Sequence, residues 1–255
     1  MSATRSSLRR DLDRLGVRPG DLLMVHGSMR KVGPVVGGVN TLVEALFDVV
    51  GVEGTLAAYL DFEPFYEDDD EEIPVFDKRI AQAARDHGIL HETLRRWPGA
   101  LRSDHPDAGV GAIGRLAEWL TRDHPFHYGY GPGSPLEKIV EANGRVAMIG
   151  APLDTITLLH YAEHLAAIPD KRVVRYRRLM AGAEGPGWVD FEEFDTGDPV
   201  HDALPGNCFE RIAMDFLAEG KGRQGMIGGA ESYLFEAREL VPFAVRWIER
   251  ACLGQ

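Results

Sequence analysis

The chain has 255 residues, of which 44% are hydrophobic and 27% are charged, with a formal net charge of −12. These values are ordinary for a globular protein with one sizeable core. The acidic balance argues against nucleic acid, whose phosphates need a basic surface. No apolar run approaches the roughly 20 residues that cross a bilayer, and the start of the chain lacks an apolar signal segment. Cys208 and Cys252 form no disulfide framework, so we expect a cytoplasmic protein.

Helix and strand patterns alternate in the first half of the chain. Leu8, Leu12 and Leu15 have helical spacing and predict an amphipathic helix. A buried strand is expected over 21–28, followed by a helix with Asn40 or Thr41 as N-cap and Gly51 just past its end. The next expected elements are a strand over 54–60, a helix over 75–87, a break at Gly88, a short helix up to Pro98, a strand over 107–114 and a helix over 115–124.

The second half continues this alternation. Ser134 followed by Pro135 indicates a helix start, because serine caps the first turn and proline fits the first helical position. The later expected elements are a strand over 145–150, a helix over 157–166, β structure with a hairpin over 171–195, and helices over 208–220 and 240–253. No repeat or domain boundary is visible. The pattern predicts a single α/β domain over 1–255, with a layered mixed sheet flanked by helices.

The stretch TLLHYAEHLA, from Thr157 to Ala166, could carry chemistry. His160 and His164 lie four residues apart and share a helix face, with Glu163 beside them. The helix follows a strand and a turn that contains Asp154, and ligands of α/β sheets bind where strands end. A neutral histidine oriented by a carboxylate is the usual general base near pH 7. We expect His160 to be this base, with Glu163 or Asp154 as its partner.

Other interpretations of the same stretch stay open at this point. His160, Glu163 and His164 fit the H-x-x-E-H pattern of one class of zinc hydrolases, with Glu231 or Glu236 as a third ligand. The non-catalytic alternative is a buried histidine whose hydrogen bond only stabilises the fold. A zinc enzyme would lose activity in a chelator and would not need a nucleotide co-substrate.

Two segments offer groups that bind anions. Ser28, Arg30 and Lys31 follow the first strand, and the pair Gly37-Gly38 leads directly into a helix. Glycines let the backbone approach a phosphate, and a helix N-terminus offers unpaired N–H groups. The spacing matches neither the dinucleotide fingerprint nor the P-loop. Further along, Arg102 and Ser103 supply donors, and His105 stands before a proline.

Two acidic clusters account for much of the negative charge. One is the run from Glu67 to Glu72, and the other contains Asp190, Glu192, Glu193, Asp195 and Asp198. Acidic runs are usually solvated loops. Because these two bracket the candidate histidines, they also favour a polycationic ligand, and a non-catalytic protein that binds polycations is a further alternative.

Four segments in this order resemble the aminoglycoside 3-N-acetyltransferases, and the resemblance extends from about Leu8 to Glu249. The segments are VHGSMRKVGPVVGGVNTLVEALFDVVGVEGTLAAYLDFE, HETLRRWPGALRSDHPDAGVGAIG, YGYGPGSPLEKI and IGAPLDTITLLHYAEH. The resemblance implies an α/β fold distinct from the GNAT acetyltransferases. It also implies transfer of an acetyl group from acetyl-CoA to the 3-amino group of the 2-deoxystreptamine ring of aminoglycoside antibiotics, which confers resistance. No metal is implied, and we expect a monomer or homodimer.

The resemblance also assigns residues. His160 resembles the family's catalytic histidine in its T-x-x-H-x-x-E helix, with Glu163 as the matching acid. The loop from His26 to Gly38, which includes Val36, is similar to the segment that holds CoA. Arg102, Ser103 and His105 match an R-S-x-H-P element near the cofactor. Tyr59, Asp61 and Glu63 fall where the family lines its sugar pocket, and we add Glu192 and Asp195 as acids for the substrate. An acceptor amine on another metabolite is the nearest alternative.

Overall fold

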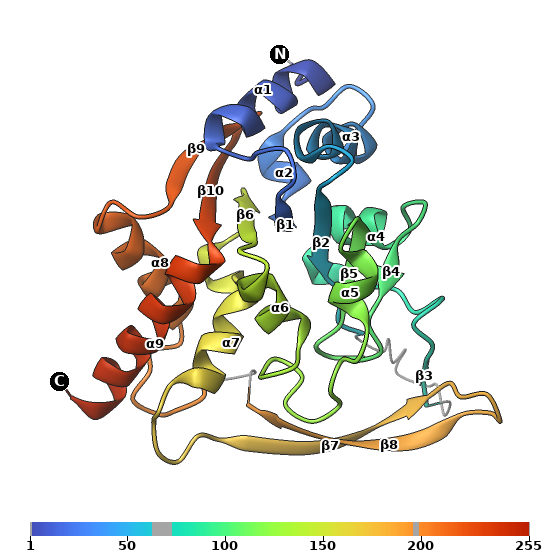
Figure 1. Cartoon of the computed structure of the whole chain (residues 1–255), viewed down its shortest axis with the longest axis vertical. Coiled ribbons are helices and arrows are strands. Elements are labelled where there is room, and N and C mark those ends of the chain that lie inside the picture. Colours follow the sequence, from blue (N-terminus) through green and yellow to red (C-terminus); the bar gives the residue numbers. More distant parts are fainter. Residues whose placement is uncertain (1, 63–72, 196–198, 255) are drawn as a thin grey trace.

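The computed structural model describes residues 2–62, 73–195 and 199–254 of the chain. Strands from both halves of these described residues form one central sheet: β1 Leu22–Gly27, β2 Thr55–Tyr59, β4 Leu101–Arg102, β5 Val110–Gly114, β6 Arg145–Ile149, β9 Arg223–Ile227 and β10 Ala230–Glu236. Their order in the sheet is β4-β5-β2-β1-β6-β10-β9 (Figure 1). β2, β1 and β6 run parallel, whereas β5 and β10 pair with them antiparallel. The α/β class with a mixed sheet, expected from the sequence, is confirmed.

The parallel strands are apolar because helices cover both faces of the sheet. Successive side chains of β1 point to opposite faces, so Leu23 and Val25 join one apolar cluster and Leu22 and Met24 join the other. The helices on the first face are α1 Arg5–Leu15, α2 Met29–Val32, α3 Val39–Val50 and α4 Ile89–Arg95. The helices on the second face are α5 Ala117–Thr121, α6 Pro135–Glu141, α7 Leu158–Leu165, α8 Cys208–Ala218 and α9 Ala237–Leu253.

The helix starts follow their local sequence. Ser134 caps α6 as predicted, since its hydroxyl accepts hydrogen bonds from the N–H groups of Leu136 and Glu137. Helix α3 ends at Gly51 as predicted, but its N-cap is Gly38, about half a turn before the expected Asn40 or Thr41. Gly38 has a φ of 67°, a conformation that glycine adopts readily, and this turns the chain directly into the helix.

A second sheet lies apart from the first. Among the described residues it consists of β3 Val75–Phe76, β7 Val173–Met180 and β8 Gly187–Phe194. β7 and β8 form the expected hairpin, which Figure 1 shows along one end of the molecule. The helix predicted over 75–87 is wrong: Val75 and Phe76 pair with β7, and only the 3-10 turn η1 Arg85–His87 is helical. The apolar spacing of this segment is satisfied by a strand pairing about 100 residues away in sequence, which no local pattern reveals.

Within the described ranges we find no helical segment with the length and apolar character that a transmembrane span requires.

Candidate active site

A cleft of about 680 Å³ opens where the parallel strands β1, β2 and β6 end. The carboxyl ends of parallel strands are the usual ligand site of α/β sheets. Its walls come from the segments after these strands, from the start of α4, and from the turn η2 Leu153–Thr155 with the first turn of α7. The lining residues are His26, Gly27, Ser28, Met29, Arg30, Lys31, Tyr59, Asp86, His87, Gly88, Ile89, His91, Gly150, Ala151, Pro152, Asp154, Thr155, Thr157 and His160.

Helix α7 brings His160 to the wall of this cleft. Residues three apart on a helix share a face, and Nδ1 of His160 lies 2.7 Å from Oε2 of Glu163. Glu163 is 4% exposed, so its carboxylate bonds to this ring rather than to water. In the tautomer that suits this contact, Nδ1–H donates a hydrogen bond to the carboxylate, and Nε2 of His160 carries the lone pair. Of the two acids that the sequence left open, Glu163 therefore holds the imidazole, whereas Asp154 lines the cleft from η2.

Aromatic side chains fix the plane of the His160 ring. The ring centroids of Tyr130 and Phe209 each lie 4.8 Å from that of His160. The hydroxyl of Tyr130 lies 2.5 Å from the hydroxyl of Tyr59, which donates to the carbonyl of Asp107 at 2.6 Å. Burial raises the pKa of both phenols well above the usual 10, so both stay neutral. The base therefore stands beside a rigid pair of tyrosines.

Three further histidines form another part of the lining, and two of them, His87 and His91, were not expected from the sequence. Nε2 of His87 lies 2.5 Å from Oδ1 of Asp61, and Nδ1 of His91 donates to the carbonyl of His87 at 2.7 Å. Burial lowers the pKa of His91 to about 4 and that of His26 well below 6.5, so both rings are neutral at pH 7. His87 and His91 are four residues apart, which would have suggested a shared helix face, but the break expected at Gly88 placed them in different elements.

The cofactor residues predicted from the first loop divide into two groups. Ser28, Arg30 and Lys31 line the cleft. Lys31 packs closely against Gly150, since a Cβ added at Gly150 would lie 2.9 Å from the Cβ of Lys31. Val36, Gly37 and Gly38 come after α2 and lie outside the lining that the described residues define. Val36 is 61% exposed. The loop therefore presents its cations to the cleft and its glycines to the start of α3.

Arg102, Ser103 and His105 are buried, and each makes a hydrogen bond to the backbone of the fold. The guanidinium of Arg102 donates to the carbonyls of Leu60 and Ala81. The hydroxyl of Ser103 accepts the Val110 N–H at 3.0 Å, and Nδ1 of His105 accepts the Ala108 N–H at 2.9 Å. These side chains stand outside the cleft lining among the described residues, so their contact with CoA stays a prediction.

The predicted substrate residues are also separated in space. Tyr59 lines the cleft, and Asp61 reaches it through His87. Glu63 lies outside the described residues. Glu192 on β8 accepts hydrogen bonds at 2.5 Å from both Tyr128 and Arg175, and Asp195 lies 3.7 Å from Arg172, so these two acids pair within the hairpin region.

The two histidines of H-x-x-E-H have different partners. His160 bonds to Glu163, whereas Nε2 of His164 lies 2.8 Å from Oε1 of Glu193. In the described part of the chain, no group of three or more His, Cys, Asp or Glu side chains is arranged to hold a metal ion. A zinc site built on His160 and His164 thus has no geometric support in these residues.

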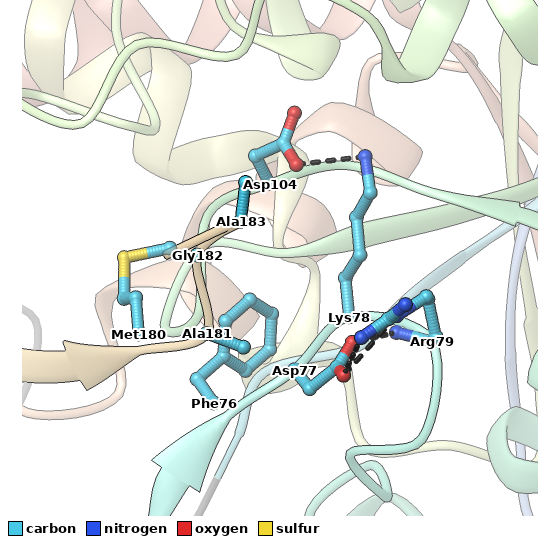
Figure 2. Close-up of a pocket in the computed structure, with 9 residues that line it drawn as sticks. All are labelled: Phe76, Asp77, Lys78, Arg79, Asp104, Met180, Ala181, Gly182 and Ala183. Carbon is cyan, nitrogen blue, oxygen red and sulfur yellow. Dashed lines mark hydrogen bonds and ion pairs between the residues drawn. The ribbon is translucent and has the colours of Figure 1, made fainter. Parts of the chain in front are cut away.

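A second cavity, of about 270 Å³, lies where β3 meets the end of β7 (Figure 2). Nζ of Lys78 bonds to Oδ1 of Asp104 at 2.7 Å across it, and Asp77 holds Arg79 beside it. Its described lining is distinct from that of the cleft. The lining residues are Phe76, Asp77, Lys78, Arg79, Asp104, Met180, Ala181, Gly182 and Ala183.

Comparisons with known proteins agree with one another. Residues 24–249 match the family model described as aminoglycoside 3-N-acetyltransferase. The aminoglycoside N(3)-acetyltransferase III of Pseudomonas aeruginosa is 44% identical over 246 residues, which cover 92% of this chain and 89% of that protein. Among solved structures, AAC-IIIb in binary complex with CoASH has a TM-score of 0.94 and 49% identity, covering 98% of this chain and 97% of that one. AAC-VIa bound to sisomicin has a TM-score of 0.91 and 36% identity, covering 98% of each chain.

These matches confirm the family that the ordered motifs indicated, and with it the transferase class rather than a hydrolase. The cleft with its histidine–glutamate pair is thus the active-site candidate of an acyltransferase, because the chain belongs to the aminoglycoside 3-N-acetyltransferase family.

Proposed function

We propose that this chain transfers the acetyl group of acetyl-CoA to the 3-amino group of the 2-deoxystreptamine ring of aminoglycosides and so confers resistance to them. The observation that carries the proposal is the His160–Glu163 pair on the cleft wall of a chain in this family. The CoASH complex of AAC-IIIb and the sisomicin complex of AAC-VIa support CoA and an aminoglycoside as the two ligands.

His160 supplies the proton chemistry of the reaction. An ammonium group cannot attack a thioester, so Nε2 of His160 accepts a proton from the substrate amine, directly or through one water. The nitrogen then forms a bond to the acetyl carbon, and the carbon–sulfur bond breaks. The proton held on Nε2 passes to the thiolate and gives the thiol, and the second proton on the newly bonded nitrogen is released to solvent, which leaves the neutral amide. Glu163 orients the ring with its Nδ1–H on the carboxylate and its Nε2 lone pair free, and it stabilises the imidazolium that forms. Such a base contributes about 10²–10⁴-fold in rate.

The charges around the cleft fit both ligands. Arg30 and Lys31 stand on one wall and suit the phosphates of CoA. Asp86 and Asp154 stand on others and suit a ligand with several ammonium groups, which the net charge of −12 also attracts. The lining therefore offers cations to the co-substrate and carboxylates to the acceptor.

Thiol release from acetyl-CoA tests the proposal directly. We expect release that depends on an added aminoglycoside, survives EDTA, and is lost in His160→Ala while binding of both ligands persists. The product should carry its acetyl group on the 3-amino nitrogen, as read by NMR of the product. Release with other amines only would move the acceptor to another metabolite, and inhibition by EDTA would revive the metal-dependent alternative.

We further propose that residues 1–255 work as a single antibiotic N-acetyltransferase domain in the cytoplasm, as a monomer or homodimer. The family model supports the single domain, because its match extends over most of the chain.

A further inference from the structure

Helix α7 also contributes His164 to a second histidine–glutamate pair, whose side chains are nearly buried. Nε2 of His164 lies 2.8 Å from Oε1 of Glu193 on β8, and the two side chains are only 5% and 4% exposed. A buried carboxylate is costly unless N–H groups bond to it. Glu193 accepts from His164, from the backbone N–H of Phe194 at 2.7 Å, and from the backbone N–H of Tyr130 at 3.2 Å. The pair therefore ties α7, β8 and the loop before α6 together.

The residue whose backbone Glu193 holds also packs on the general base. The ring centroid of Tyr130 lies 4.8 Å from that of His160. At its far end, the Tyr130 hydroxyl lies 2.5 Å from the hydroxyl of Tyr59. Glu193 thus fixes the backbone end of Tyr130 and Tyr59 fixes the other, so the ring is held against His160 from both ends.

Close packing couples His164 to this loop. A Cβ on Gly131 would lie 2.5 Å from Nδ1 of His164, so the loop backbone passes directly against the imidazole. On another side, the Phe194 ring centroid lies 4.6 Å from that of His164. Protein interiors at this density transmit small displacements, so loss of the His164 side chain shifts the loop that carries Tyr130.

We propose that His164 and Glu193 form a positioning pair that holds Tyr130 against His160 and so fixes the imidazole in its productive orientation. Both residues act through Tyr130 rather than on the substrate. The effect on turnover rests on the proposed function, whereas the effect on the His160 ring does not. The two can therefore be tested separately.

The first test measures the NMR resonances of the His160 ring and does not depend on catalysis. Tyr130 shifts the NMR resonances of a ring this close, and the His160 signals are assigned by their loss in His160→Gln. We expect them to move in His164→Ala and to return in His164→Gln, whose side-chain N–H stands the same number of bonds from the backbone as Nε2. Unchanged His160 resonances in His164→Ala would overturn the proposal, even if the wild type were inactive on every aminoglycoside.

The second test measures the steady-state kinetics of the His164 variants. We expect His164→Ala to lower kcat by roughly 10²-fold with KM for acetyl-CoA within about twofold, because small misplacements of a catalytic group cost this much. His164→Gln should restore most of the rate. If His164→Ala does not fold, as judged by circular dichroism, Glu193→Gln carries the same test with its shape kept and its charge removed.

A double variant separates positioning from general damage. If the pair acts through Tyr130, His164→Ala should cost little further rate in a Tyr130→Ala background, since coupled residues are not additive. A full additional loss in that background would show that His164 acts independently, and the positioning role would be wrong.

Discussion

Glu163 reaches His160 at 2.7 Å from within the same short helix, so its carboxylate sets both the tautomer and the direction of the ring. This contact is independent of the rest of the fold once α7 has formed. Asp154, the other acid that the sequence offered, contributes charge to the cleft from a different element.

We therefore expect Glu163→Gln to lower kcat by about 10²–10⁴-fold, because an amide oxygen can still accept a hydrogen bond from Nδ1–H but stabilises the imidazolium far less. Asp154→Asn is the matched comparison, since it removes an equal charge from the same cleft without touching His160. It should raise KM for the aminoglycoside and leave kcat within a few-fold. Steady-state kinetics of thiol release measures both, and equal effects on kcat would contradict the assignment of Glu163.

Substitution of Arg102 distinguishes a role in CoA binding from a role in the stability of the fold. Its guanidinium bonds to backbone carbonyls of Leu60 and Ala81 and lies 5.0 Å from the Phe76 ring centroid, and burial lowers its pKa to about 10. We expect Arg102→Met to lower the free energy of unfolding by about 3 kcal/mol, since hydrogen bonds from a charged group are lost and carbonyls are left buried. KM for acetyl-CoA should stay unchanged. Urea unfolding and kinetics test this, and a raised KM at unchanged stability would favour the CoA contact.

At the scale of elements, the segment between β1 and α3 places two cationic side chains in the lining of the cleft. Helix α2 is a single turn that follows β1 directly, and it presents Arg30 and Lys31 to the lining. The chain then reaches α3 through Gly37 and Gly38, which both have positive φ. The strand, the turn and the glycines together keep this cationic segment at the end of the sheet.

Lys31→Met should raise KM for acetyl-CoA about tenfold, which is the loss expected for one charge-assisted contact to a phosphate. The increase should shrink at high salt, because screening weakens the contact in the wild type as well. Lys221→Met serves as the control, since Lys221 is a half-buried lysine outside the cleft lining that pairs with Glu219. An equal KM for Lys31→Met and wild type would place the phosphates elsewhere.

At the scale of the whole molecule, buried neutral histidines make stability depend on pH. Burial lowers the pKa of His91 and His105 to about 4 and that of His124 to about 3. In the unfolded chain each titrates near 6.5, so between about pH 6.5 and 4 the unfolded state binds more protons. Their contribution to stability is complete above about pH 6.5 and is lost as the pH falls through this window.

The free energy of unfolding should therefore fall on acidification from pH 7 to 4.5, by up to roughly 1.4 kcal/mol per pH unit for each such histidine. Urea unfolding at several pH values measures the slope. His124→Gln should flatten it by about one histidine's share, because glutamine offers an amide to Ser103 or Gly129 and does not titrate. A stability that stays constant over this range would show that these rings bind protons in the folded state as they do in the unfolded chain, against the lowered pKa values.

The amino-acid sequence by itself determined the features that depend on neighbours in the chain. Helical spacing placed Glu163 beside His160 but left Asp154 open as its partner until the structure showed the Glu163 contact. Ser134 and Pro135 predicted the α6 cap, and the order of the motifs indicated the family. The physical reason is that residues three or four apart in a helix meet wherever that helix packs.

Only the tertiary structure decided the contacts between distant segments. It brought His87 to Asp61 and His164 to Glu193, turned the expected helix at Val75 into a strand, and placed Arg102 on backbone carbonyls. Each of these depends on which strands pair and in which register, and that choice is set by burial across the whole sheet rather than by local preference. The family resemblance indicated which residues belong to the site, whereas their burial and their hydrogen-bond partners became known only from the folded structure.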